Sequence, residues 1–231
     1  MTAALHIGFL VFPRVTQLDL MGPAQVLSRV PGAQVHLVWK THEPLATDVG
    51  FSINPTVTFA ECPQLDVLCT PGGIGVVDLL NDGETMDFLR AQGAAARYVT
   101  SVCNGSLLLG AAGLIDGYRS ACHWMWRHFL PAFGAEPVAA RVVRDRNRIS
   151  GGGVTSGIDF GFTVAAELAG PETARMIQLG IEYDPQPPFD CGSPEKAGAE
   201  RVAQARSVAQ TALQGAEPLV AAAARRLALR P

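Results

Sequence analysis

The 231-residue sequence has no hydrophobic run of the roughly 18 apolar residues that a membrane-spanning helix needs. It also has no excess of basic residues, because 18 lysines and arginines stand against 21 acidic residues and the net charge is −3. A nucleic-acid-binding protein needs a basic patch or stripe, so this balance argues against such a partner. The sequence therefore predicts a protein that uses neither a membrane nor a nucleic acid as partner.

Cysteine is scarce, and its spacing excludes the common zinc and dithiol motifs. There is no C-x-x-C pair and no zinc-like spacing between cysteine and histidine, so no metal site is expected. The apolar start ALHIGFLVF has no basic segment before it and predicts a first strand, not a signal peptide. An odd number of cysteines without an export signal indicates reduced thiols in the cytoplasm. The five cysteines are Cys62, Cys69, Cys103, Cys122 and Cys191.

Apolar strand-like runs alternate with helix-like runs along most of the chain. LHIGFLVF and LDVLCT are typical of strands buried on both faces, whereas DGETMDFLRAQGAAA is typical of a helix. RVVRDRNRIS predicts two short strands around a polar turn. This alternation predicts an α/β fold with a mostly parallel sheet. We expect a single domain over residues 1–231, with an α/β core over 1–192 and a helical tail over 193–231.

The run YVTSVCNGSLLLG, residues 98–110, places a cysteine where a strand ends and a helix is expected to begin near residue 104. A tight strand-to-helix turn pushes its central residue out of the sheet, as in the nucleophile elbow. Ser101 and Gly105 supply the small flanking residues that such a close crossing requires. We therefore predict that Cys103 is a nucleophile whose thiolate is favoured by backbone N–H groups at the helix start. The other four cysteines are expected to be buried small hydrophobes.

An isolated carboxylate, Asp19, lies between leucines in TQLDLMGP, after the first strand and before a helix. This position is on the same edge of a parallel sheet as Cys103. Desolvation and a neighbouring negative charge both raise the pKa of a carboxyl group, so Asp19 is expected to retain its proton beside a thiolate. A helix N-cap explains an aspartate here equally well, and the sequence leaves the two interpretations open.

Glycine-rich turns and one histidine complete the candidate site. Gly72 and Gly73 follow the LDVLCT strand, and their amides are expected to point at the site as an anion hole. Gly152, in a run of three glycines, would let the backbone approach a ligand or a helix. His123, in ACHWMW, is expected to pack or hydrogen-bond near the site more than to act as a base. Neither turn matches a nucleotide-binding motif.

Together these motifs resemble the ThiJ/PfpI superfamily, and within it the isocyanide (isonitrile) hydratases. The resemblance runs through IGFLVFPRVTQLDLMGP, LDVLCTPGG, RYVTSVCNGSLLLGAAGL, HW, SGGGVTSGIDF and EYDPQPPF, which together span most of the chain. It implies a flavodoxin-like three-layer α/β sandwich, a homodimer and a reactive cysteine at the elbow. Many superfamily members carry glutamate where this chain has Asp19, and the hydratase branch carries aspartate.

The family reaction adds water to an isocyanide, R–N≡C, and gives an N-substituted formamide. The resemblance implies that Cys103 attacks the terminal carbon to form a thioimidate, while Asp19 exchanges protons with the thiol and the substrate carbon. No metal or organic cofactor is needed for this chemistry. One departure is Asn104, which stands where related hydratases carry a threonine whose hydroxyl assists catalysis. An amide cannot relay a proton as a hydroxyl does, so rate and substrate range are in doubt more than reaction class.

Other functions compete with hydration. A glyoxalase-like or amidase-like enzyme could use the same fold and the same cysteine, whereas a superfamily peptidase would place a histidine directly after Cys103. A ligand-sensing domain of the kind fused to AraC-type regulators would need helix-turn-helix units for which the tail is too short. A redox sensor based on reversible oxidation of Cys103 is the remaining alternative.

Overall fold

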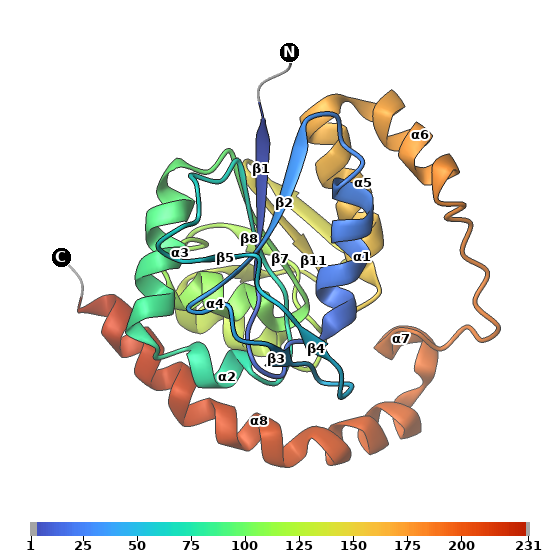
Figure 1. Cartoon of the computed structure of the whole chain (residues 1–231). Helices are drawn as coiled ribbons and strands as arrows, with labels where there is room; N and C mark the ends of the chain where they lie inside the picture. Colours follow the sequence, from blue (N-terminus) through green and yellow to red (C-terminus); the bar gives the residue numbers. More distant parts are fainter. Residues whose placement is uncertain (1–3, 230–231) are drawn as a thin grey trace.

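The computed structural model describes residues 4–229, which form a seven-stranded sheet covered by helices on both faces (Figure 1). The strand order is β10-β11-β7-β6-β1-β2-β5, and every pair is parallel except β10 with β11. This arrangement confirms the predicted α/β fold of flavodoxin-like class. The strands are β1 (Leu5–Leu10), β2 (Ala33–Trp39), β3 (Leu45–Ala46), β4 (Ser52–Ile53), β5 (Val57–Thr58), β6 (Val67–Thr70), β7 (Tyr98–Val102), β8 (Arg119–Ser120), β9 (Glu136–Pro137), β10 (Val142–Asp145) and β11 (Arg148–Gly151).

Helices α1 and α5 pack against each other on one side of the sheet, and α3 and α4 lie on the other (Figure 1). Two 3₁₀ helices, Cys103–Gly105 and Arg127–Phe133, connect the regular elements. The α-helices are α1 (Gln17–Leu27), α2 (Val76–Leu79), α3 (Gly83–Ala95), α4 (Ser106–Ala111), α5 (Ser156–Ala169), α6 (Pro171–Gly180), α7 (Pro194–Ala197) and α8 (Ala199–Ala228).

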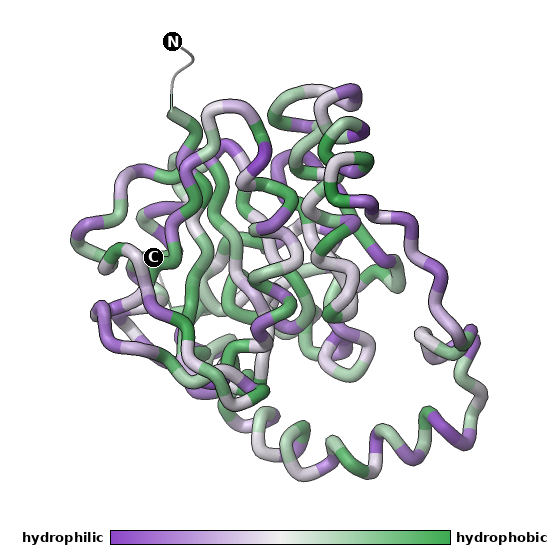
Figure 2. Tube along the Cα trace, turned by 45° about the vertical axis from the view of Figure 1, so that its right-hand side comes forward, coloured by the Kyte–Doolittle hydropathy of each residue, from purple (hydrophilic) through white to green (hydrophobic). Residues whose placement is uncertain are grey.

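The central strands are apolar because both of their faces are covered. All residues of β6 and β7 are buried, as are the last four of β1. In Figure 2 the most hydrophobic stretches run through these strands, whereas α8 alternates between hydrophilic and hydrophobic residues. The predicted pair of short strands around a polar turn is confirmed as β10 and β11.

The order of the strands determines where a site can form. The chain leaves β1 toward β2 on one side and then crosses back to β6 on the other side of β1. Loops therefore diverge between the carboxyl ends of β1 and β6, which is the crevice where open α/β sheets bind ligands. The loops that follow β1, β6 and β7 meet at this edge, because the three strands are neighbours in the sheet.

The expected helical tail is the long helix α8, which runs past α2 and α4 along one edge of the molecule (Figure 1). Its buried residues are Ala216, Val220 and Ala223, all in its second half. Arg226 fixes this half by donating hydrogen bonds to the side chain of Asn81 and to the carbonyl of Leu80. Over residues 4–229 no helix is both long and apolar enough to cross a membrane.

The imidazoles of His6 on β1 and His36 on β2 share a hydrogen bond of 3.0 Å between Nδ1 and Nε2. Burial, and then the charge of His6, lower the pKa of His36. A histidine with a lowered pKa binds its proton at a lower pH in the folded protein than in the unfolded protein. Its contribution to stability is therefore lost as the pH falls below about 6.5.

We expect the urea midpoint of the wild type to fall more between pH 7 and pH 5 than the midpoint of His36→Gln. The variant removes this titrating group while leaving the other four histidines in place. Equal losses in the two proteins would contradict this assignment.

Candidate active site

The nucleophile candidate, Cys103, stands at a strained turn between β7 and α4. Its φ of +59° lies in the left-handed region, which a non-glycine residue occupies at a cost of order 1–3 kcal/mol. A Cβ added to Gly105 would lie 2.1 Å from the carbonyl oxygen of Thr70, so the crossing of helix and strand requires glycine there. The elbow geometry is therefore present. The expected helix begins with a 3₁₀ turn at Cys103, and α4 itself begins at Ser106.

Asp19 is completely buried in the first turn of α1. The backbone N–H of Gly72 donates a hydrogen bond of 2.9 Å to its Oδ2. Its Oδ1 has no hydrogen-bond partner of ordinary geometry within the described residues, and the adjacent Cys103 thiol is close enough to affect its titration. The N-cap of α1 is Thr16, so the interpretation of Asp19 as a helix cap is wrong.

Burial dominates the titration of both groups. It raises the pKa of Asp19 to about 7, against the opposing effects of the hydrogen bond from Gly72 and of the nearby Cys103 thiol. Burial and the negative charge of Asp19 raise the pKa of the Cys103 thiol well above its usual value. The expectation that the helix start favours a thiolate is therefore wrong, because the N–H of Asn104 is outweighed by desolvation. The thiol of Cys103 therefore keeps its proton until a base removes it.

Asn104 is buried, with 2% of its surface exposed, and its amide contacts a single glycine twice. Its Oδ1 accepts from the N–H of Gly73 at 2.8 Å, and its Nδ2 donates to the carbonyl oxygen of Gly73 at 3.1 Å. Both glycine amides are thus occupied, the one of Gly72 by Asp19 and the one of Gly73 by Asn104. The two glycines do not form the expected free anion hole, since their donors hold the site residues.

Gly72 lies at the point where the three candidate catalytic residues meet. A Cβ at this position would lie 2.4 Å from Asn104 Oδ1, 2.7 Å from Asp19 Oδ2 and 2.7 Å from Cys103 Cβ. Contacts under 3.0 Å force their partners to move. Only glycine allows Asp19 of α1 to approach Cys103 and Asn104 of the elbow this closely.

The other two candidates, His123 and Gly152, make contacts of their own. The half-buried His123 accepts a hydrogen bond from the N–H of Met125 at 3.4 Å, and burial lowers the pKa of its ring. Its Cδ2 would lie 3.9 Å from a Cβ at Gly153, so the ring packs on the glycine turn that begins α5. Gly152 follows the residue that pairs with Val102 in the sheet, but its N–H donates to the carbonyl of Arg141.

Two neighbours were not anticipated from the sequence. Cys122 is buried as expected, with a pKa raised to about 12, and it lies close enough to Cys103 for the ionisation of one thiol to oppose that of the other. Asp48 accepts from the N–H of Gln17 at the start of α1, and its charge contributes to the raised pKa of Asp19. No local signal marks Asp48, because it reaches α1 from the turn between β3 and β4.

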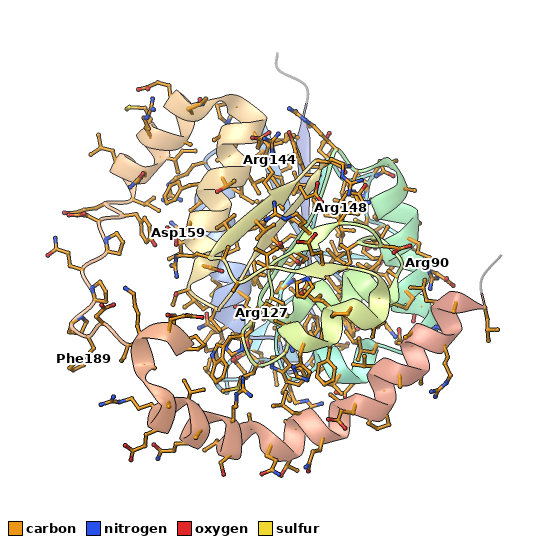
Figure 3. All side chains as sticks on the ribbon, turned by 180° about the vertical axis from the view of Figure 1, so that it is seen from behind. Arg90, Arg127, Arg144, Arg148, Asp159 and Phe189 are labelled. Carbon is orange, nitrogen blue, oxygen red and sulfur yellow. The ribbon has the colours of Figure 1, made fainter. Side chains whose placement is uncertain are left out.

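Other polar groups lie apart from the thiol. Figure 3 places Asp159 on α5, where it accepts hydrogen bonds from Arg141 and from the hydroxyl of Tyr183 and so ties the segment after α6 to this helix. Within residues 4–229 no three His, Cys, Asp or Glu side chains gather to hold a metal ion.

Known proteins resemble this chain over most of its length. Residues 6–167 match the DJ-1/PfpI family. The chain is 53% identical to the isonitrile hydratase of Pseudomonas putida over 98% of this chain and 100% of that protein. A ThiJ/PfpI family protein from Pseudomonas syringae has a similar solved structure, with 44% identity, a TM-score of 0.91, and coverage of 94% of this chain and 91% of that one. The HTH-type transcriptional regulator GbdR of Pseudomonas aeruginosa is 29% identical over 76% of this chain, which spans 48% of the regulator.

The fold and the site define an α/β protein with a cysteine at a strand–helix elbow and a buried acid beside it. The chain belongs to the DJ-1/PfpI family.

We expect Gly72→Ala to move Asp19 and Asn104 away from Cys103 and so to change the rate at which iodoacetamide alkylates this thiol. The rate is read from the peptide that contains Cys103, because the exposed Cys191 is also alkylated, and circular dichroism confirms the fold. Gly215→Ala is the matched control, because a Cβ at Gly215 on α8 meets nothing within 4 Å. Similar alkylation rates for the two variants would refute the proposed crowding.

We expect Asp19→Asn to be more stable than the wild type above pH 7. A carboxyl whose pKa is raised on folding stabilises the folded state below its unfolded value, and this contribution is lost as pH rises from 3.8 through about 7. The asparagine has no such loss, so the difference in melting temperature between the two proteins should widen from pH 5 to pH 8. A constant difference across this range would show that the pKa of Asp19 is the same in the folded and the unfolded protein.

Proposed function

We propose that the protein hydrates isocyanides to N-substituted formamides, with Cys103 as nucleophile and Asp19 as proton carrier. The buried contact between a thiol and a carboxyl of pKa about 7 is the observation that carries this proposal. The 53% identity to an isonitrile hydratase over nearly the whole chain supports the same reaction.

The chemistry follows from where the protons are. The terminal carbon of R–N≡C must gain a nucleophile and a hydrogen. The ionised Asp19 takes the proton from the Cys103 thiol as sulfur attacks, and the protonated carboxyl then delivers it to the same carbon. The product of this step is a thioimidate, S–CH=N–R. A group whose pKa is near the working pH does both tasks well.

Water completes the reaction. It adds to the thioimidate carbon while Asp19 accepts one of its protons, and Asp19 then passes this proton to the nitrogen. The C–S bond then breaks, the formamide R–NH–CHO leaves, and the sulfur regains its proton. The sum is one isocyanide and one water converted to one formamide, with no change in oxidation state. The half-buried His123, whose pKa burial lowers, would border the site as a neutral ring.

The competing functions have less support. The GbdR relative is a transcriptional regulator, but its identity of 29% is well below the 53% of the isonitrile hydratase, and this chain spans only 48% of it. A histidine-dependent hydrolase is disfavoured because Asn104 follows the cysteine and its amide is bound to Gly73.

The setting of the enzyme is also part of the proposal. A cytoplasmic location is supported by five cysteines that are all free thiols. A homodimer is inferred from the resemblance to the hydratase branch. It is compatible with the exposed apolar side chains of Met176 and Leu179 on α6 and Val208 on α8.

We expect the purified protein to convert simple aryl and alkyl isocyanides to formamides, followed by loss of isocyanide and appearance of the formamide. Cys103→Ala should abolish turnover, because it removes the sulfur that attacks the carbon. Cys191→Ala removes an exposed thiol and should retain full activity. Turnover by Cys103→Ala at the wild-type rate would remove Cys103 from the mechanism.

A further inference from the structure

Asn104 contacts the chain in a way that suits a structural clamp better than a proton relay. Its two polar side-chain atoms are both committed to the backbone of Gly73, one as acceptor and one as donor. It is buried at the turn that carries the nucleophile. This double contact therefore fixes the loop after β6 relative to the elbow after β7.

The loop that Asn104 holds is the one that binds the acid. Gly72, directly before Gly73, donates its N–H to Oδ2 of Asp19. The carbonyl of Gly72 in turn accepts from the N–H of Thr16, and Val15 forms an isolated antiparallel bridge with Gly73. The Gly72–Gly73 turn is thus attached on one side to Asn104 and on the other to the start of α1, which carries Asp19.

No other side chain of the described residues makes a hydrogen bond to the backbone of Gly73. Gly73 also has a φ of +140°. Because glycine adopts many backbone conformations, this turn would change conformation readily if nothing held it. Removing the amide of Asn104 would leave this peptide unit without its side-chain partner. The turn would then be held only by its backbone contacts with Val15, Thr16 and Val76, which leave the N–H of Gly72 freer to turn away from the carboxyl of Asp19.

We propose that Asn104 is a positioning residue that, through the backbone of Gly73 and Gly72, holds the carboxyl of Asp19 against Cys103. The inference rests on the proposed function for its effect on turnover, but not for its effect on Asp19 itself. The amide of Asn104 binds the N–H and the carbonyl of Gly73 with two separate atoms. A threonine at this position would have to bind both groups with its one hydroxyl oxygen.

The clamp has a consequence for protonation. The hydrogen bond from Gly72 lowers the pKa of Asp19 against the larger effect of burial. Loosening the turn weakens this bond, so the pKa of Asp19 rises above about 7 in a variant that lacks the amide. The lower limb of the pH–rate profile then moves to higher pH, because the ionised carboxyl is the form that takes the thiol proton.

The experiment compares the wild type with Asn104→Ala and Asn104→Thr. The control is Ser101→Ala, which truncates a buried hydroxyl on β7 that has no hydrogen-bond partner within residues 4–229. The first readout needs no substrate: the γ-carbon of Asp19 is followed by ¹³C NMR against pH and assigned by its loss in Asp19→Asn. The second readout is kcat and KM for isocyanide hydration against pH.

In Asn104→Ala we expect the midpoint of the Asp19 titration to rise by roughly half a unit to one unit, as for a carboxylate that loses one N–H donor. We expect kcat to fall about 10- to 100-fold with little change in KM, because the acid is misplaced while the binding surface remains. For Asn104→Thr, the midpoint of the Asp19 titration and kcat should both lie between those of Asn104→Ala and the wild type. Ser101→Ala should match the wild type in both readouts.

The proposal would be overturned if Asn104→Ala left the midpoint of the Asp19 titration unchanged. It would also be overturned if Asn104→Thr had a higher kcat than the wild type and the same titration midpoint. If Asn104→Ala does not fold, Asn104→Thr carries the same test. If the wild type converts no isocyanide, the proposed function fails, while the NMR titration still decides whether Asn104 positions Asp19.

Discussion

The site depends on one carboxyl group that is kept out of water beside a thiol. Asp19 has no exposed surface and one backbone donor, so its ionised form is disfavoured and its pKa rises to about 7. The same burial, together with the charge of Asp19, keeps the proton on Cys103. Neither group is reactive alone in this setting. A proton that passes between them makes sulfur nucleophilic at the moment when the substrate carbon needs hydrogen.

The architecture exists to bring these two groups together from different strands. Asp19 follows β1, the Gly72–Gly73 turn follows β6 and Cys103 follows β7, at the edge where the strand order reverses. Backbone strain and close packing are concentrated at this edge. Cys103 has a positive φ, and there is no room for a Cβ at Gly72. Such costs are tolerated at functional sites because the packed sheet behind them is stable.

The sequence was sufficient for features that local pattern determines. The strand-like run ending at Val102 and the small residues around Cys103 revealed the elbow, and the leucines around Asp19 revealed a buried acid. It was not sufficient for contacts made across the fold. The bonds of Gly72 to Asp19 and of Gly73 to Asn104 join residues 53 and 31 positions apart, and no periodicity encodes them. The direction of the Cys103 pKa was misjudged because depth of burial, which outweighs the helix start, is a property of the packed protein.

The most direct test of this account is the intact mass of the protein, acid-quenched within milliseconds of mixing with an aryl isocyanide. Addition of a thiol to an isocyanide has no leaving group, so the account predicts a transient species heavier by the mass of the whole isocyanide, located on Cys103 by peptide mapping and absent from Asp19→Asn. Rapid turnover in which Cys103 never carries this mass, or in which Asp19→Asn accumulates it as fast as the wild type, would contradict the shared proton on which the account rests.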